Sequence, residues 1–176
     1  MKITISGKPG SGKSTVTRIL AERLGLKVYS VGDFMRDMAK RRGMSLIGLS
    51  QLAERDRRID EELDDRQIRL RNEDNFVLNS RIGFHFIPDS VKVFLDVDIA
   101  KAAQRILHDK RKEESAKSIE EMELEIKTRM RSEQTRYSQY YGIDLYDRKN
   151  FDLTINTSNI SAEKVAEKII RHIKKA

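Results

Sequence analysis

The residues whose spacing most clearly indicates chemistry lie near the N-terminus, where Gly7, Gly12, Lys13 and Ser14 follow the pattern glycine, four residues, glycine, lysine, serine. This is the pattern of a phosphate-binding loop, or P-loop. Glycines let the backbone turn sharply and approach a phosphate, and the successive N–H groups then point inward at the positive end of the following helix. The lysine adds a point charge for the β- and γ-phosphates, and the serine hydroxyl can bind Mg²⁺. The pattern predicts a site for a nucleoside triphosphate.

The context of this loop agrees with that chemistry. An alternating apolar strand over residues 2–6 precedes it, and a helical pattern begins at about Lys13. The residues predicted to surround the phosphates are Gly7, Lys8, Pro9, Gly10, Ser11, Gly12, Lys13, Ser14 and Thr15. The chain lacks the guanine-reading Asn-Lys-x-Asp of switch GTPases and the apolar strand ending in Asp-Glu of many ATPases. A P-loop alone leaves the phosphate acceptor open.

Arginines at three separate places in the sequence are candidates for holding that acceptor. The groups are Asp33 with Arg36, then Arg81, and then Arg129, Glu133 and Arg136 at i, i+4 and i+7, with Arg105 and Arg131 as further candidates. The first two groups follow predicted strand ends, where ligands bind in open parallel sheets, and the third shares one helix face. Converging arginines can clamp phosphates and neutralise transition-state charge, although isolated helix arginines more commonly form surface salt bridges.

The elements that must position these residues alternate between strand and helix. Apolar patterns predict strands at residues 2–6, 26–30, 75–80, 91–97 and 151–156, and helices at 13–24, from Asp33, 46–71, 99–108, 119–141 and 161–173. We expect Asp33 to cap its helix and the charge-dense residues 108–118 to be exposed and mobile. This alternation predicts one α/β domain over 1–176, with a parallel sheet covered by helices on both faces.

The composition excludes some classes of protein and favours others. The chain of 176 residues has a net charge of +7, which favours anionic partners, and it has no cysteine, which excludes disulfides and thiolate metal sites. No apolar run approaches the roughly 20 residues that span a bilayer, and the first residues lack a secretory pattern. We expect a cytoplasmic monomer without membrane attachment.

Several segments together resemble the archaeal-type cytidylate kinases of the nucleoside monophosphate (NMP) kinase superfamily. They are GKPGSGKST (7–15), YSVGDFMRDMAKRRGMSL (29–46), VLNSRIG (77–83), RMRSEQTRYSQYYGID (129–144) and FDLTINTS (151–158), and the similarity runs from Met1 to about Ile173. The resemblance implies a three-layer P-loop NTPase fold with a five-stranded parallel sheet, a mobile NMP-binding region over 33–72 and a lid over 107–130. It also implies the reaction of ATP with CMP or dCMP to give ADP and CDP or dCDP, with Mg²⁺ as cofactor.

The resemblance further assigns roles to matching positions. Lys13, the loop amides and Arg105 would bind ATP; Ser14 and Asp33 would bind the metal; Ser30, Asp33, Arg36 and Arg81 would hold the acceptor; Arg129 and Arg136 would bridge donor and acceptor, oriented by Glu133. Two positions depart from the family pattern, which often has an acidic residue in place of Asn79 and an arginine in place of Ala102. Because asparagine carries no charge, Asp33 or Asp96 would have to supply the negative charge next to the Mg²⁺-bound water.

Two alternatives stay open. A kinase of the same fold could use AMP, UMP or a small metabolite such as shikimate, because base choice depends on a few pocket contacts. The pI near 9.6 and the cluster HDKRK (108–112) instead suggest a nucleic-acid-binding protein. Against this second alternative, acidic residues are interleaved with the basic ones over 107–133, and the sequence has no aromatic ladder for stacking bases. We therefore expect mononucleotides and not nucleic acid as partners.

Overall fold

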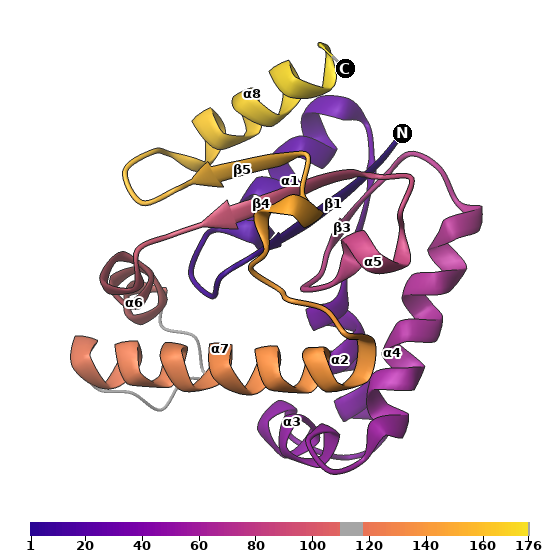
Figure 1. Cartoon of the computed structure of the whole chain (residues 1–176), viewed down its shortest axis with the longest axis vertical. Helices are drawn as coiled ribbons and strands as arrows, with labels where there is room; N and C mark the ends of the chain where they lie inside the picture. Colours follow the sequence, from indigo (N-terminus) through magenta and orange to yellow (C-terminus); the bar gives the residue numbers. More distant parts are fainter. Residues whose placement is uncertain (110–117, 176) are drawn as a thin grey trace.

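Five short strands form one parallel sheet in the order β2-β3-β1-β4-β5 (Figure 1). The computed structural model describes residues 1–109 and 118–175. The strands are β1 (Lys2–Gly7), β2 (Lys27–Ser30), β3 (Phe76–Asn79), β4 (Val91–Asp96) and β5 (Leu153–Asn156). Every neighbouring pair is parallel, so all five strands end at the same edge of the sheet. The predicted five-stranded parallel sheet is confirmed.

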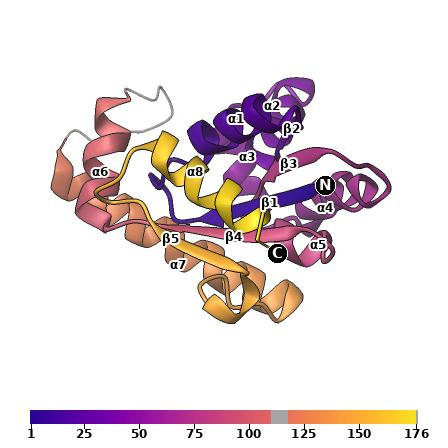
Figure 2. The same cartoon turned by 90° about the horizontal axis from the view of Figure 1, so that it is seen from above.

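Helices cover both faces of the sheet, which gives three layers (Figure 2). Helices α1 (Lys13–Leu24) and α8 (Ala162–Ile173) pack on one face, where Ile5 and Leu95 of the sheet are fully buried together with Ile169. The other face is covered by α5 (Gly83–Phe86) and by the chain that follows the long helix α7 (Ile119–Tyr141). Because both faces are buried, β3 and the middle of β4 are almost continuously apolar, as is typical of parallel sheets, whereas the central strand β1 alternates Ile3 and Ile5 with the buried polar residues Thr4 and Ser6.

Between β2 and β3 the chain leaves the sheet and forms a helical arm (residues 31–72). It consists of α2 (Val31–Arg41), α3 (Leu46–Ala53), α4 (Arg57–Arg69) and η1 (Leu70–Asn72). The arm has an apolar cluster of its own, in which Met38, Leu49 and Ile59 are almost completely buried. The side chains of residues 46 and 47 are outside this description. The arm is thus a separately packed unit at the carboxyl edge of β2.

Two helix boundaries in the arm differ from the sequence prediction. Helix α2 begins at Val31, and its N-cap is Ser30, whose Oγ accepts from the backbone N–H of Asp33; the prediction that Asp33 caps the helix is wrong. The single helix expected over 46–71 is divided at residues 54–56. There Asp56 caps α4 by accepting from the N–H of Arg58 at 3.1 Å. A local side-chain cap decided both boundaries, because it satisfies backbone donors that a continuous helix would otherwise have to pair.

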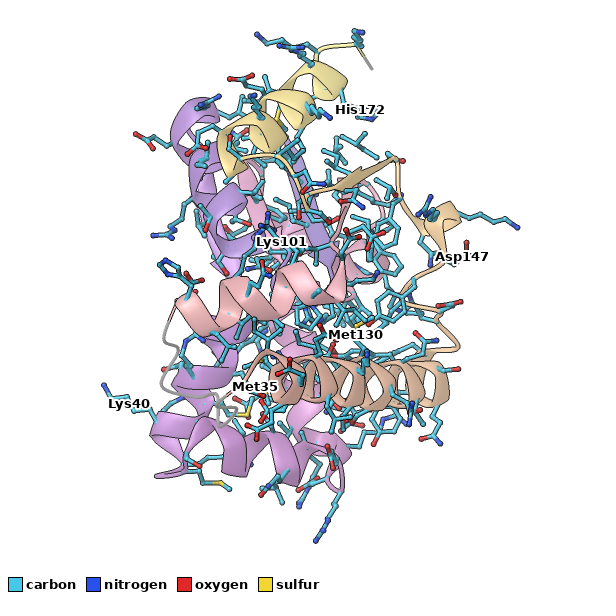
Figure 3. The ribbon with its side chains drawn as sticks, turned by 90° about the vertical axis from the view of Figure 1, so that its left-hand side faces the viewer. Met35, Lys40, Lys101, Met130, Asp147 and His172 are labelled. Carbon is cyan, nitrogen blue, oxygen red and sulfur yellow. The ribbon has the colours of Figure 1, made fainter. Side chains whose placement is uncertain are left out.

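Helices α6 (Ile99–His108) and α7 (Ile119–Tyr141) follow β4 and complete the carboxyl edge, ahead of η2 (Arg148–Asn150). Helix α7 lies between α6 and the arm (Figures 1 and 3), and Met130 lies on its α6 side. It ends at Tyr141, as the predicted range 119–141 indicates, and Gly142 caps it in the left-handed conformation with φ 67°. Of the expected lid over 107–130, residues 110–117 lie outside the described residues, as does most of the predicted mobile segment.

Candidate functional site

Glycines allow the P-loop to pass close to two neighbouring elements. Gly7 has φ 148°, and a Cβ there would lie 2.2 Å from the carbonyl oxygen of Leu95. Gly10 has φ 73°, and a Cβ there would lie 2.8 Å from both Cα and Cβ of Ala102 on α6. Gly12 is the left-handed N-cap of α1. The loop therefore runs directly into a helix N-terminus, which is the geometry of a phosphate cradle.

Two lysines of the loop have different surroundings. The Lys13 ammonium folds back over the loop and donates to the carbonyl oxygens of Gly7 at 2.9 Å and Lys8 at 2.7 Å. The Lys8 ammonium instead pairs with the Asp96 carboxylate at 2.7 Å, at the end of β4. Lys13 is thus held at the mouth of the cradle, whereas Lys8 ties the loop to the sheet.

The predicted metal residues Ser14 and Asp33 lie on different elements. The Ser14 hydroxyl at the start of α1 accepts from Nδ2 of Asn79, at 3.2 Å, where β3 ends. The Asp33 carboxylate is exposed on α2 and pairs with Arg36 one turn later. No group of three or more His, Cys, Asp or Glu side chains within residues 1–109 and 118–175 could hold a metal ion. The Ser14 hydroxyl thus lies at the cradle, whereas the Asp33 carboxylate lies on the arm.

Arg105 lies beside the P-loop on α6. Its guanidinium donates to the carbonyl oxygen of Thr157 at 2.6 Å, to the Thr157 hydroxyl at 3.2 Å and to the carbonyl oxygen of Gly10 at 3.4 Å. Ala102, one turn earlier, is 1% exposed and packs against Gly10. Position 102 is therefore buried directly beside the P-loop, where this chain has a small side chain in place of the arginine that the family pattern often has.

Glu133 joins two of the predicted arginines at the centre of the site. Its carboxylate pairs with Nε of Arg81 at 2.7 Å and Nε of Arg129 at 3.0 Å, and its side chain is only 13% exposed. Burial alone would raise the pKa of Glu133, but Arg81 and Arg129 lower it to about 2. Arg81 also donates through Nη1 to the carbonyl oxygen of Gly7 at 3.0 Å. A continuous series of hydrogen bonds and ion pairs therefore connects the P-loop to α7, through Gly7, Arg81, Glu133 and Arg129.

Arg136 is held by a different carboxylate, which the sequence interpretation missed. Its Nε lies 3.5 Å from Oδ2 of Asp60 on α4, and its Nη2 donates to the Tyr137 hydroxyl at 3.3 Å. Asp60 is 4% exposed, and burial raises its pKa despite the neighbouring Arg136. A weak signal existed in the sequence, because Asp60 lies between Ile59 and Leu63 on the inner face of the predicted helix.

Arg36, Asp33 and Ser30 form a separate group at the start of the arm. The Arg36 side chain is 51% exposed and pairs with Asp33, which in turn donates its backbone N–H to the Ser30 hydroxyl. The structure thus brings the P-loop together with the second and third groups of arginines. The first group stands on the arm, on its own.

Two cavities adjoin arginines of α7. A cavity of about 160 Å³ next to the P-loop is lined by Pro9, Ile106, Met122, Glu125, Ile126 and Arg129. A second, of about 400 Å³, lies between the end of α3 and α7 and is lined by Glu54, Thr128, Arg131, Ser132, Thr135, Arg136, Gln139 and Tyr140. Arg129 therefore lines the cavity beside the cradle, and Arg131 and Arg136 line the cavity beside the arm.

Solved structures of other proteins are similar to this chain along its whole length. Solved structures share the fold: a shikimate kinase from Bacteroides thetaiotaomicron has a TM-score of 0.71 at 13% identity, covering 100% of this chain and 99% of its own. An uncharacterized protein from Eubacterium ventriosum has a TM-score of 0.77 at 18% identity, with the same coverage of both chains.

No helix among the described residues combines the length and apolar composition that crossing a bilayer requires.

Sequence relatives are closer and cover almost the entire chain. Cytidylate kinase from Methanothermobacter thermautotrophicus is 40% identical over 164 residues, which are 93% of this chain and 99% of the relative. Cytidylate kinase from Sulfolobus acidocaldarius is 40% identical over 176 aligned residues, covering 97% and 92%. The model of the cytidylate kinase-like family matches residues 2–159. The chain belongs to the cytidylate kinase-like family.

Proposed function

We propose that this protein transfers the γ-phosphoryl group of ATP to CMP or dCMP, giving ADP and CDP or dCDP. The observation that carries the proposal is the meeting of two cations at one atom. The carbonyl oxygen of Gly7 accepts from Lys13 at 2.9 Å and from Arg81 at 3.0 Å. Lys13 belongs to the triphosphate cradle, and Arg81 belongs to the arginines on the acceptor side. A phosphoryl group between donor and acceptor would lie where these two charges converge.

On the donor side, the residues from Gly7 to Thr15 would hold the triphosphate through backbone N–H groups and Lys13. Arg105 is fixed beside the loop by the Thr157 and Gly10 carbonyl oxygens, where it would contact the nucleotide. Mg²⁺ fits this site through the Ser14 hydroxyl, because magnesium commonly keeps several waters and binds substrate phosphates with one or two protein oxygens. When bound, the ion would neutralise charge on the β- and γ-phosphates.

On the acceptor side, Arg36 and Arg81 would bind the monophosphate, with Ser30 and Asp33 shaping the start of the arm. Arg129 and Arg136 would contact the phosphates of both nucleotides, since they line the two cavities on either side of the transfer point. Glu133 keeps Arg81 and Arg129 in fixed relative positions. Its low pKa keeps it ionised at neutral pH, so both pairs are present while the enzyme works.

The chemistry needs no covalent intermediate on the protein. An oxygen of the acceptor's phosphate attacks the γ-phosphorus, and the bond from that phosphorus to the bridging oxygen of ADP breaks. Lys13, Arg81, Arg129 and Arg136 would stabilise the charge on the phosphoryl oxygens. Packing of α7 between the sheet and the arm would limit the entry of water, which otherwise competes as acceptor. We also propose that the protein is cytoplasmic, since a chain without cysteine suits a reducing compartment, and that it is a monomer.

An acceptor panel tests the proposal. CMP, dCMP, UMP, AMP and shikimate are supplied in turn with ATP and Mg²⁺, and ADP release is measured by a coupled assay. CMP and dCMP should give the highest kcat/KM. A higher value for shikimate, AMP or UMP would assign the chain to the alternative of a same-fold kinase with another acceptor. Omitting Mg²⁺ tests the cofactor, and gel filtration at the elution volume of a 20.4 kDa protein tests the monomer.

A further inference from the structure

Asp60 and Arg136 form a buried pair whose facing atoms are incompletely hydrogen-bonded. Oδ2 of Asp60 and Nε of Arg136 are both buried without a hydrogen-bond partner among the described residues, and they lie 3.5 Å apart. A buried charge without full hydrogen bonding is costly, and stability alone would favour apolar residues at both positions. The pair therefore calls for a reason other than stability.

The position of the pair supplies such a reason. Asp60 lies on α4 of the arm, and Arg136 lies on α7, which also carries Arg129 and Glu133. One turn further along both helices, Asp64 accepts a hydrogen bond from the Tyr141 hydroxyl. The Arg57 guanidinium on α4 lies 5.1 Å from the centroid of the Tyr140 ring. Side chains of α4 thus contact the C-terminal half of α7 at three successive places.

The orientation of Arg136 follows from these contacts. Nε faces Asp60, Nη2 donates to Tyr137, and the guanidinium lies 5.1 Å from the centroid of the Tyr137 ring. The side chain also lines the 400 Å³ cavity between α3 and α7. A guanidinium has five N–H donors in a fixed plane, so fixing one edge with a carboxylate determines where the other edge points.

We propose that Asp60 is a positioning residue, which holds the Arg136 guanidinium toward the phosphates and makes its placement depend on the arm. This inference rests on the proposed function, because it requires Arg136 to contact the reacting phosphates. Arm and transfer arginine would then move together. The contact between Asp60 and Arg136 orients the guanidinium, and a movement of the arm away from α7 would separate the pair and release the arginine.

The test is a double-mutant cycle on kcat/KM for CMP. Asp60→Asn keeps the shape and removes the charge. We expect it to lower kcat/KM for CMP about 10- to 100-fold, the range expected for misplacing a phosphate-binding group, with the KM for ATP unchanged. In an Arg136→Ala background the same substitution should change kcat/KM less than about twofold, because Asp60 then has no guanidinium to hold. Asp65→Asn, an exposed position on α4, is the matched control and should stay within about twofold of wild type.

A second readout separates positioning from folding. Asp60→Asn removes one buried charge but leaves the Arg136 guanidinium without its carboxylate, so we expect a lower melting temperature, and activity is measured well below it, where the variant is folded. Added guanidinium ion should restore part of the activity of Arg136→Ala, but not that of the Asp60→Asn/Arg136→Ala double variant. If Asp60→Asn folds poorly, Asp60→Glu replaces it in the cycle, since the longer carboxylate should displace the guanidinium and lower kcat/KM for CMP.

Two results would overturn the inference. One is a wild-type kcat/KM for CMP in the Asp60 variants; the other is a decrease in kcat/KM by the same factor whether residue 136 is arginine or alanine. The proposed function fails in a different way, through wild-type enzyme that does not phosphorylate CMP or an Arg136→Ala variant with full activity. The two failures are therefore distinguishable.

Discussion

Glu133 is the carboxylate on which the centre of the site depends, and replacing it with glutamine is a perturbation whose effect on stability can be worked out. Glu133→Gln keeps the size of the side chain and removes the charge that faces Arg81 and Arg129, at 2.7 and 3.0 Å. Both guanidinium groups would then have lost their carboxylate partner. Arg81 would keep its hydrogen bond to the carbonyl oxygen of Gly7.

The expected loss follows from the pKa of Glu133. The two arginines lower this pKa from 4.5 to about 2, against the opposing effect of burial. The difference corresponds to about 3 kcal/mol in favour of the ionised form. Removing one member of a buried ion pair costs roughly 3–5 kcal/mol, which agrees in size. We expect Glu133→Gln to lower the free energy of unfolding by about 3 kcal/mol at neutral pH.

The dependence on pH has a definite sign. A lowered carboxyl pKa stabilises the fold fully above the unfolded value of 4.5, and this stabilisation disappears as the pH falls toward 2. The difference between wild type and Glu133→Gln should therefore shrink over that window. Urea unfolding followed by circular dichroism, at several pH values between about 7 and 3, measures it.

A matched control lies on the same helix. Glu123 pairs with Lys127 at 3.7 Å, and the two residues have the same i, i+4 spacing as Arg129 and Glu133, with the acidic residue first. Both side chains of this control pair are partly exposed to solvent, at 29% and 53%. Glu123→Gln should cost less than about 0.5 kcal/mol at any pH. The reasoning is refuted if Glu133→Gln costs under about 1 kcal/mol at neutral pH, or if its cost does not change as the pH is lowered.

Three further variants test other parts of the structure. Lys13→Ala should lower kcat by on the order of 10²–10³ with an unchanged melting temperature, and wild-type turnover would contradict the P-loop assignment. Gly10→Ala should lower the free energy of unfolding, measured in urea, by about 1–3 kcal/mol more than Gly25→Ala does. Both residues have positive φ, but only position 10 lacks room for a Cβ, and equal decreases for the two variants would contradict this. Burial raises the pKa of Asp64 to about 6, so wild-type stability should fall as the pH rises from about 4 to 6. Asp64→Asn, at a partly buried position, should be more stable than wild type by about 1–2 kcal/mol at neutral pH, and a less stable variant would contradict this.

Local patterns predicted most of the fold correctly. The P-loop, the strands and the helices over 13–24, 119–141 and 161–173 depend on residues within a few positions of one another, and the structure has them within a residue or two of the predicted ranges. The two wrong boundaries in the arm have a shared cause. Ser30 and Asp56 were better caps than the polar helical pattern around them revealed, because cap strength depends on backbone geometry that composition does not encode.

The site was predictable where spacing alone brings residues together. Arg129 and Glu133 are one turn apart on α7, and they do form a pair. The partner of Arg136 was not predictable, since Asp60 reaches it only through the packing of α4 against α7. A carboxylate in a polar helix is typical of a solvated face, and only the fold shows that this one is buried. The pairing of Lys8 with Asp96 is likewise a consequence of tertiary structure.

Following the γ-phosphoryl group itself is the most direct test of the central claim, that the cradle and the arginines together make a phosphoryl transferase for cytidine nucleotides. Enzyme is incubated with CMP and ATP labelled at the γ-phosphorus with ³²P, and the products are separated by chromatography. The label should appear in CDP, with little release as inorganic phosphate when CMP is omitted. Label that accumulates as inorganic phosphate in the presence of CMP, or that remains in ATP, would contradict the account.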